Sequence, residues 1–340
     1  MRQDQTQLDS FKDSVPVNRY DIVGTRRSPT TKSTRCVLKL IDHGTAQLSH
    51  SEFKELHIHH IDSENAEVFW CRLNNSSSLL KHAFYYQGIR ENAIEGYSVS
   101  FDNLDAWQRP LDARPIFVFS IGRCGSTLFA KVCDVAGLMT WSEPDAFTNL
   151  ATDPRLNKTP KQFRMLSRVA LVDLADKAKA AGKANFGIKL RAPATAICED
   201  LCGHHPNSVC YFMVREPISW ARSWHRLWGS KPVRLANSLS QKVEEVRLAK
   251  SRGLNVQILT YEALIEDPET QVRKIARHAN APEVDMNRLN TVLETDAQKS
   301  TTVGRSSGSP VSEDFDQQFV AALRKRAPRL LETNPENWLS

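Results

Sequence analysis

Residues 122–127 read Gly-Arg-Cys-Gly-Ser-Thr and bring two glycines, one basic side chain and two hydroxyl groups into one short turn. An apolar run of strand type, residues 116–119, precedes the turn, and apolar residues at helical spacing follow it. Glycine lets the backbone approach a ligand closely, and the amides at a helix start attract anions. The sequence therefore predicts a strand, a phosphate-binding turn and a helix, in that order.

The turn lacks the lysine that a nucleoside-triphosphatase needs. In those enzymes Lys stands directly before the Ser or Thr that holds magnesium, whereas here Gly125 stands before Ser126. The basic residue comes earlier, at Arg123, which favours an anion bound by amides, hydroxyls and a guanidinium without a metal. A glycine turn that joins a strand to a helix for purely structural reasons is the alternative interpretation.

Arg215 and Ser223 form a second candidate anion site. Arg215 directly follows the apolar run of residues 209–214, and Ser223 lies eight residues later in a predicted helix. Ligands of an open parallel sheet bind at the carboxyl ends of its strands, so Arg215 is expected where a ligand would lie. A triphosphatase often carries an acidic magnesium ligand at such a strand end, and the arginine indicates a second phosphate group instead.

The two sites together resemble the sulfotransferase family, whose donor is 3′-phosphoadenosine 5′-phosphosulfate (PAPS). In that family the first loop holds the 5′-phosphosulfate, and an Arg with a Ser eight residues later holds the 3′-phosphate. The resemblance covers about residues 106–323 and rests on the order and spacing of the motifs. It implies that the donor is bound by residues of both motifs, namely Arg123, Cys124, Gly125, Ser126, Thr127, Arg215 and Ser223.

Two later segments resemble further parts of the donor site in this family. Tyr261, in Thr-Tyr-Glu-Ala-Leu, matches a strand end where the family places a Tyr near the adenine. Arg305, in Gly-Arg-Ser-Ser-Gly, is similar to a late basic loop that folds over the 3′-phosphate. Arg123 brings the chain closer to the bacterial and tyrosylprotein-type branches, because many cytosolic members have Lys there, and Trp where this chain has Leu128.

Sulfuryl transfer to a hydroxyl group requires positioning, stabilisation of negative charge and a base. The resemblance implies that Arg123 stabilises the transferring group and that Glu143, on the segment after the loop helix, is the general base. We expect burial and nearby anions to raise the pKa of Glu143. Two alternatives stay open: Ser142 or Glu143 merely caps a turn before Pro144, or His225 is the base.

Most cysteines and histidines are expected to be structural. Seven cysteines form an odd, scattered set, which favours free thiols over a disulfide framework. Cys124 is the exception, because a helix start and Arg123 both favour a reactive thiolate. His57 and His59 share one face of a predicted strand, but no acidic or cysteine partner stands at ligand spacing, so we expect no metal site.

Patterning divides the chain into three parts. Residues 1–30 are predicted to be a polar arm, residues 31–105 a small β-rich accessory module and residues 106–340 a sulfotransferase-like domain. In the last part strands alternate with helices, which predicts an α/β fold of P-loop type with a parallel sheet and crossover helices. The predicted strands span residues 116–121, 186–190, 209–214 and 256–260, and the predicted helices span residues 127–136, 160–181, 217–228, 235–252 and 268–279.

Composition limits the partners. The 340 residues carry a net charge of +6 that is spread along the chain, which suits an anionic small ligand better than a nucleic acid. No apolar run is long enough to cross a membrane, and the first residues lack the apolar core of a signal peptide, which predicts a cytoplasmic protein. The acceptor, a hydroxyl of a small molecule, glycan or lipid, and the oligomeric state are left open.

The sequence thus predicts a PAPS-dependent sulfotransferase that uses in-line displacement. A P-loop nucleotide kinase is the first alternative, and the missing lysine and the presence of Arg215 disfavour it. A non-catalytic nucleotide-binding protein with a degenerate loop is the second alternative. The intact pair of Arg215 and Ser223 speaks against that possibility.

Overall fold

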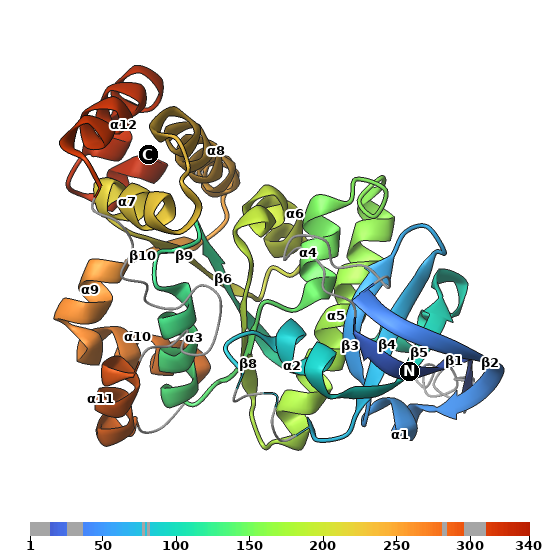
Figure 1. Cartoon of the computed structure of the whole chain (residues 1–340). Coiled ribbons are helices and arrows are strands. Elements are labelled where there is room, and N and C mark those ends of the chain that lie inside the picture. The colour runs from blue at the N-terminus through green and yellow to red at the C-terminus, as the bar shows by residue number, and fades with distance from the viewer. Residues whose placement is uncertain (1–13, 26–36, 77–78, 80–81, 281–283, 296–310) are drawn as a thin grey trace, which may run out of the picture.

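The chain folds around two five-stranded sheets (Figure 1). The computed structural model describes residues 14–25, 37–76, 79, 82–280, 284–295 and 311–340. The first sheet is antiparallel with the order β2-β1-β5-β4-β3, and the second is parallel with the order β10-β9-β6-β8-β7. The parallel sheet with its flanking helices confirms the α/β class predicted from the sequence. Among the described helices, none has both the length and the apolar character needed to cross a membrane.

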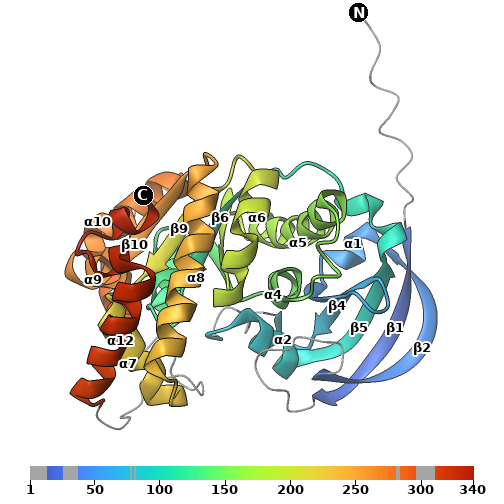
Figure 2. The same cartoon turned by 90° about the horizontal axis from the view of Figure 1, so that it is seen from above.

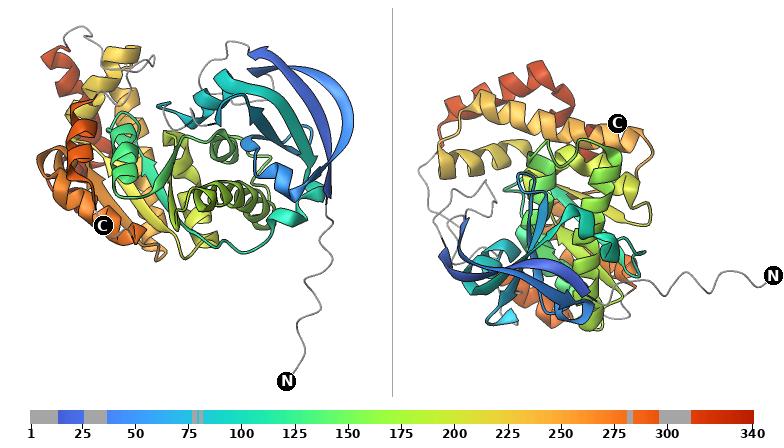
Figure 3. Two further views of the ribbon diagram at one scale, coloured as in Figure 1. Left: turned by 90° about the horizontal axis from the view of Figure 1, so that it is seen from below. Right: turned by 90° about the vertical axis from the view of Figure 1, so that its right-hand side faces the viewer.

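The N-terminal part of the chain builds the antiparallel sheet. Its elements are β1 (Ser14–Thr25), β2 (Leu38–Ser49), α1 (His50–Phe53), β3 (His57–Asp62), β4 (Glu67–Leu73), α2 (Tyr85–Asn92), β5 (Ala93–Ser100), η3 (Phe101–Asn103) and η4 (Asp105–Trp107), where η marks a 3-10 helix. Strands β1 and β2 pair over most of their length and curve along the outer edge of the molecule (Figure 3).

The rest of the chain builds the parallel sheet and the helices around it. Its strands are β6 (Arg114–Ser120), β7 (Met139–Ser142), β8 (Asn185–Lys189), β9 (Val209–Val214) and β10 (Val256–Thr260). Its helices are α3 (Ser126–Val135), α4 (Asp145–Thr152), α5 (Pro160–Ala180), η5 (Ala192–Ile197), α6 (Cys198–His204), α7 (Pro217–Trp228), α8 (Pro232–Ser251), α9 (Tyr261–Glu266), α10 (Pro268–Ala279), α11 (Met286–Glu294), α12 (Glu313–Arg326), η6 (Pro328–Leu331) and η7 (Pro335–Leu339).

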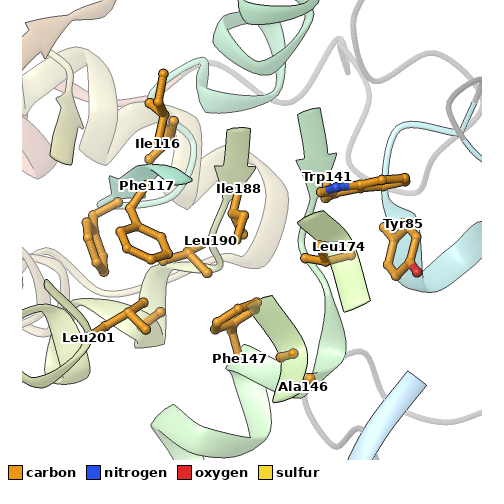
Figure 4. Close-up of a cluster of buried hydrophobic side chains, with 14 of the residues drawn as sticks. Tyr85, Ile116, Phe117, Trp141, Ala146, Phe147, Leu174, Ile188, Leu190 and Leu201 are labelled. Carbon is orange, nitrogen blue, oxygen red and sulfur yellow. The ribbon is translucent and has the colours of Figure 1, made fainter. Parts of the chain in front are cut away.

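The parallel sheet is buried on both faces. All residues of β9, and residues 115–120 of β6, are buried. Strands covered on both faces read as continuous apolar runs, which is why the sequence located four of the five strands. Strand β7 escaped prediction because it has only four residues, two of them Thr and Ser. Phe147 of α4 and Leu174 of α5 lie near Ile188 of β8 (Figure 4).

Helices α4 and α5 lie between the two sheets (Figure 2). Buried polar groups tie them to strand β3: the Ile61 amide donates to Asn149 over 3.1 Å, and the Ile58 amide donates to Asp173 over 3.3 Å. Asp173 also accepts a hydrogen bond from Trp70 Nε1 over 3.0 Å. The apolar core runs without a break from one sheet to the other. The antiparallel sheet is therefore fixed to the helices that support the parallel sheet.

The predicted polar arm is wrong for residues 14–25, which form strand β1 and pair with β2 and β5. Val15, Val17 and Tyr20 are buried. An irregularity in the pairing between Asn18 and Tyr20 shifts the buried face by one residue, so the alternation that marks a strand is interrupted. That interruption explains why the sequence pattern did not reveal the strand. Residues 1–13 and 26–30 lie outside the described part of the chain.

His57 and His59 on β3 are buried and held neutral. Burial, aided by the charge of Lys177, lowers the pKa of His57 to about 2, and burial, aided by Arg90, lowers the pKa of His59 to about 3. In the unfolded chain both groups titrate near their ordinary value of 6.5, so the unfolded state binds more protons below that pH. We expect the free energy of unfolding to fall by up to about 1.4 kcal/mol per histidine for each pH unit below about 6.5.

Denaturant unfolding between about pH 7.5 and about pH 5.5 measures this loss. His59→Asn should flatten the dependence on pH, because it removes one of the groups that gain a proton on unfolding. His43→Gln is the matched control, since His43 is exposed beside Asp21. A free energy of unfolding that stays constant over this range would contradict the neutral, buried state of the two histidines.

Candidate active site

The predicted phosphate loop connects the centre of the parallel sheet to a helix. Strand β6 ends at Ser120, and α3 begins at Ser126 with Gly125 as its N-cap. Three residues of the turn have left-handed backbones: Gly122 at φ 73°, Arg123 at φ 54° and Gly125 at φ 81°. No side chain caps the start of α3. A turn of this kind, followed by an uncapped helix start, favours an anion.

The structure brings the two predicted anion motifs together. Arg123 Nε donates a hydrogen bond to Ser223 Oγ over 3.2 Å, although the two residues are 100 positions apart. Helix α7, which carries Ser223, is also fixed to the loop by Trp220, whose Nε1 donates to the Gly122 carbonyl over 2.7 Å. The Trp224 ring lies against Gly122, because a Cβ atom there would come within 3.2 Å of the ring. Trp220 and Trp224 of α7 therefore support the loop.

Tyr261 and Arg215 lie on the other side of the loop. The guanidinium of Arg215 lies over the Tyr261 ring at 4.7 Å, and the same ring lies so close to Gly125 that a Cβ there would come within 2.3 Å of it. The Arg215 Nε is buried and, among the described residues, has no hydrogen-bond partner. A buried charged donor without a partner is costly. The stack of Arg215, Tyr261 and Gly125 thus presents a cation suited to an anionic ligand.

Glu143 is surrounded by cations. It follows β7 with a left-handed backbone, at φ 59°, and its amide donates to the Lys189 carbonyl over 2.7 Å. One carboxylate oxygen accepts a hydrogen bond from Lys189 Nζ, and the other accepts one from Arg191 Nε over 3.0 Å. Burial alone would raise the pKa of Glu143, but the charges and hydrogen bonds of Lys189 and Arg191 outweigh it and lower that pKa. The predicted rise is wrong, because the neighbours are cations.

Lys189 and Arg191 were missed by the sequence reasoning. Lys189 is the last residue of β8, the strand beside β6, and it lies opposite Val118. Strand β6 leads into the phosphate loop two residues after Val118, so the end of β8 lies beside the start of the loop. Ligands of a parallel sheet bind at the carboxyl ends of its strands, and this rule singles out Lys189 as well as Arg215 once β8 is recognised. Its pairing with Glu143 depends on strand β7, which the sequence did not reveal.

Cys124 is not the reactive thiol expected from the sequence. Its side chain is buried and donates to the Met213 carbonyl over 3.2 Å. Burial raises the pKa of this thiol more than the nearby Lys189 charge lowers it. The side chain points into the protein, so Cys124 can contact a ligand of the loop only through its backbone. The other described cysteines are also free and buried.

His225, the alternative base, is engaged elsewhere. His225 Nδ1 lies 3.0 Å from the Ser230 carbonyl, and its ring packs against Phe315 at 4.4 Å. These contacts engage His225 with the end of α7 and with α12, which disfavours it as the base. Arg305 lies outside the described residues. Within the described part of the chain, no group of three or more His, Cys, Asp and Glu side chains is arranged to hold a metal.

Fold and site together define an α/β protein with a glycine-rich anion loop at the carboxyl end of its central strand. Cationic side chains from two neighbouring strand ends, Lys189 and Arg215, lie near that loop, and Arg123 within the loop is paired with Ser223. Such an arrangement binds phosphate or sulfate groups through amides and side-chain cations.

No protein-family model and no curated protein matches the chain. Solved structures that are similar include a sulfotransferase from Mycobacterium avium, at 14% identity and a TM-score of 0.45, covering 68% of this chain and 79% of that chain. The sulfotransferase domain of the Synechococcus PCC 7002 olefin synthase is 16% identical, with a TM-score of 0.39 and coverage of 68% and 96%. Retinol dehydratase in complex with androsterone and inactive cofactor PAP is 13% identical, with a TM-score of 0.35 and coverage of 68% and 82%.

The first two of these proteins bear the name of the family that the sequence motifs resemble. Because identities and TM-scores at this level are low, the similarity carries no argument about function. The function is therefore inferred from the residues of this chain.

Proposed function

We propose that the protein is a sulfotransferase that moves a sulfuryl group from PAPS to a hydroxyl acceptor. The observation that carries the proposal is the contact between Arg123 and Ser223. It joins a loop suited to a phosphosulfate to a helix whose preceding strand ends in Arg215, the residue expected to hold a 3′-phosphate. Two anion sites joined in this way suit a nucleotide that carries phosphate groups at both its 5′ and its 3′ position.

Different residues of the site would bind the two ends of the donor and stabilise the charge of the transferring group. The loop amides, Ser126 and Thr127 would bind the 5′-phosphosulfate, while Arg215 and Ser223 would bind the 3′-phosphate with Tyr261 behind Arg215. Arg123 and Lys189 would stabilise negative charge on the transferring group and on the leaving phosphate. These cations take the place that lysine and magnesium have in a triphosphatase.

The chemistry is a single in-line displacement. The acceptor oxygen forms a bond to sulfur as the bond from sulfur to the 5′-phosphate oxygen breaks, and its electron pair leaves with 3′-phosphoadenosine 5′-phosphate (PAP). The proton of the acceptor hydroxyl passes to Glu143, the carboxylate beside Lys189 and Arg191. The acceptor is a hydroxyl compound, and the cytoplasm is the expected location.

Thermal unfolding with PAP, and separately with ATP and magnesium, tests the proposal. A ligand at about one hundred times its Kd should stabilise the fold by roughly 2.7 kcal/mol. We expect PAP to raise the unfolding temperature equally with and without a chelator. A shift that appears only with ATP and magnesium would favour a kinase, and no shift with either nucleotide would favour a degenerate, non-catalytic loop.

Gly125→Ala should destroy the donor site. The new Cβ would meet the Tyr261 ring at 2.3 Å and would occupy a left-handed backbone at φ 81°. The backbone alone should cost about 1–2 kcal/mol of stability. Displacement of Tyr261 should in addition remove the surface on which Arg215 rests, so we expect PAP affinity to fall at least about tenfold.

Gly253→Ala is the matched control for this change. Gly253 has a left-handed backbone at φ 90°, but no atom lies within 4 Å of a Cβ placed there. It should lose similar stability and keep its PAP affinity. Denaturant unfolding and calorimetric titration measure the two quantities. Wild-type affinity in Gly125→Ala would contradict the assignment of this loop.

A further inference from the structure

Lys189 lies between two possible partners, Glu143 and the anion loop. We propose that Lys189 changes partner during the reaction: it pairs with Glu143 in the donor-free protein and with the sulfuryl group of the donor in the loaded protein, so that Glu143 becomes a competent base only after the donor has bound. This inference rests on the proposed sulfotransferase function. It adds to that function an order of events built into the site.

The Glu143–Lys189 pair is enclosed by protein. The side chain of Lys189 is 4% exposed and that of Glu143 is 14% exposed. Charges buried to this degree need a partner, because each has lost its water. Among the described residues Lys189 has one hydrogen-bond partner on a side chain, Glu143, while its ammonium also faces the Phe84 ring at 5.5 Å. A new anion close to Lys189 would therefore compete directly with Glu143.

The second cation on Glu143 is held in place from other directions. Arg191 also contacts Asp145, at 3.3 Å between Nη2 and Oδ1. Its guanidinium lies over the Tyr86 ring at 4.0 Å, and Arg90 lies over the same ring at 4.7 Å. Arg90 itself donates to Asp145 over 2.8 Å. These contacts fix Arg191 to α2 and α4, so Lys189 is assigned as the cation that changes partner.

Lys189 ends the strand that separates the loop from Glu143. Strand β8 lies between β6, which leads into the loop, and β7, which leads to Glu143. Lys189 pairs with Val118 of β6, and β6 ends two residues later at Ser120, where the loop begins. A donor held by the loop would bring its sulfuryl group to this same region. Lys189 is thus placed to exchange one anion for the other by a side-chain rotation.

The exchange would change the acidity of Glu143. In the donor-free protein the two cations keep the pKa of Glu143 below its ordinary value of 4.5, which makes the carboxylate a weak base. Loss of Lys189 would leave Arg191 as its cation and Asp145 as the nearest other acid, with Tyr86 and Arg90 on α2 beyond them. The pKa of Glu143 must then rise, because burial favours the protonated form.

Proton uptake on donor binding tests this exchange without an acceptor. PAPS is titrated into the full chain by calorimetry, at pH values from 4.5 towards neutrality and in buffers of different ionisation enthalpy. We expect the wild-type protein to take up more protons than Glu143→Gln, with a difference of up to about one proton per bound donor that grows as the pH falls. The 3′-phosphate makes the same contribution in both proteins and cancels.

Two further variants keep the test decisive. Lys189→Met leaves Glu143 paired with Arg191 and removes the exchange, so it should bind PAPS with the lower proton uptake of Glu143→Gln. Asp134→Asn is the matched control: burial raises the pKa of Asp134 to about 6, but this residue accepts from the Thr140 amide, away from Lys189. It should keep the wild-type uptake.

The outcomes separate the two hypotheses. Equal proton uptake by the wild type and by Lys189→Met, with donor bound to both, would overturn the exchange and leave the proposed function standing. If the wild-type chain fails to bind PAPS or PAP, the proposed function itself fails. If Glu143→Gln does not fold, the comparison of the wild type with Lys189→Met still decides.

Discussion

Arg123→Ala is expected to lower the rate of sulfuryl transfer by about 10²–10³-fold while PAP affinity falls by less than about tenfold. Arg123 lies in the loop itself, and its Nε is held by Ser223 at 3.2 Å. A guanidinium fixed in this way is a positioned cation that stabilises negative charge as it develops during transfer. An interaction made mainly in the transition state affects turnover more than binding.

Transfer of a sulfuryl group from p-nitrophenyl sulfate to PAP measures this effect without the natural acceptor. Arg123→Lys should recover part of the rate, because it keeps the charge and loses the planar fork. Arg109→Ala is the control for removing an arginine elsewhere, since Arg109 is partly exposed and paired with Asp176. Unchanged turnover in Arg123→Ala would remove the residue from the transition state.

The strands of the parallel sheet and the anion loop could be predicted because their signals are local. Residues 209–214 form one apolar run, and burial on both faces of the sheet explains why no polar residue interrupts it. Likewise Gly125 is needed for a left-handed backbone that the Tyr261 ring covers. In both cases the signal lies within one short stretch of sequence, because burial of the strand and the left-handed backbone of the turn each select the residue types found there.

The environment of Glu143 could not be predicted because it is assembled from distant segments. Its carboxylate is bound by Lys189 and Arg191, which lie 46 and 48 residues away. Its backbone follows β7, a strand too short and too polar to be recognised. Burial was rightly expected, but the sign of the pKa shift depends on which charges share the site, and the sequence does not give their positions.

Helix α2, in the N-terminal part of the chain, contacts the charged cluster around Glu143, which its sequence did not indicate. Tyr86 and Arg90 of α2 lie against Arg191 and Asp145, close to the end of β8. The helices α4 and α5 hold the antiparallel sheet in place through Asn149 and Asp173. The N-terminal residues therefore fix one of the two cations on Glu143, which gives this part of the chain a role beyond stability.

Arg215→Ala is expected to weaken PAP binding by about 10–100-fold and to leave the affinity for adenosine 5′-phosphosulfate nearly unchanged. The reason is that Arg215 Nε is buried with no hydrogen-bond partner among the described residues, and its guanidinium lies over the Tyr261 ring at 4.7 Å. A charged donor in this state gains its hydrogen bonds from the 3′-phosphate, which the second nucleotide lacks.

Calorimetric titration of both nucleotides measures the selectivity directly. Tyr261→Phe should keep most PAP affinity, because it preserves the ring under Arg215, and Arg222→Ala should keep all of it, because Arg222 is paired with Asp316 of α12. A loss shared equally by PAP and adenosine 5′-phosphosulfate would show that Arg215 supports the fold of the loop and does not read the 3′-phosphate. A loss confined to PAP ties Arg215 to the phosphate that distinguishes the proposed donor from ATP.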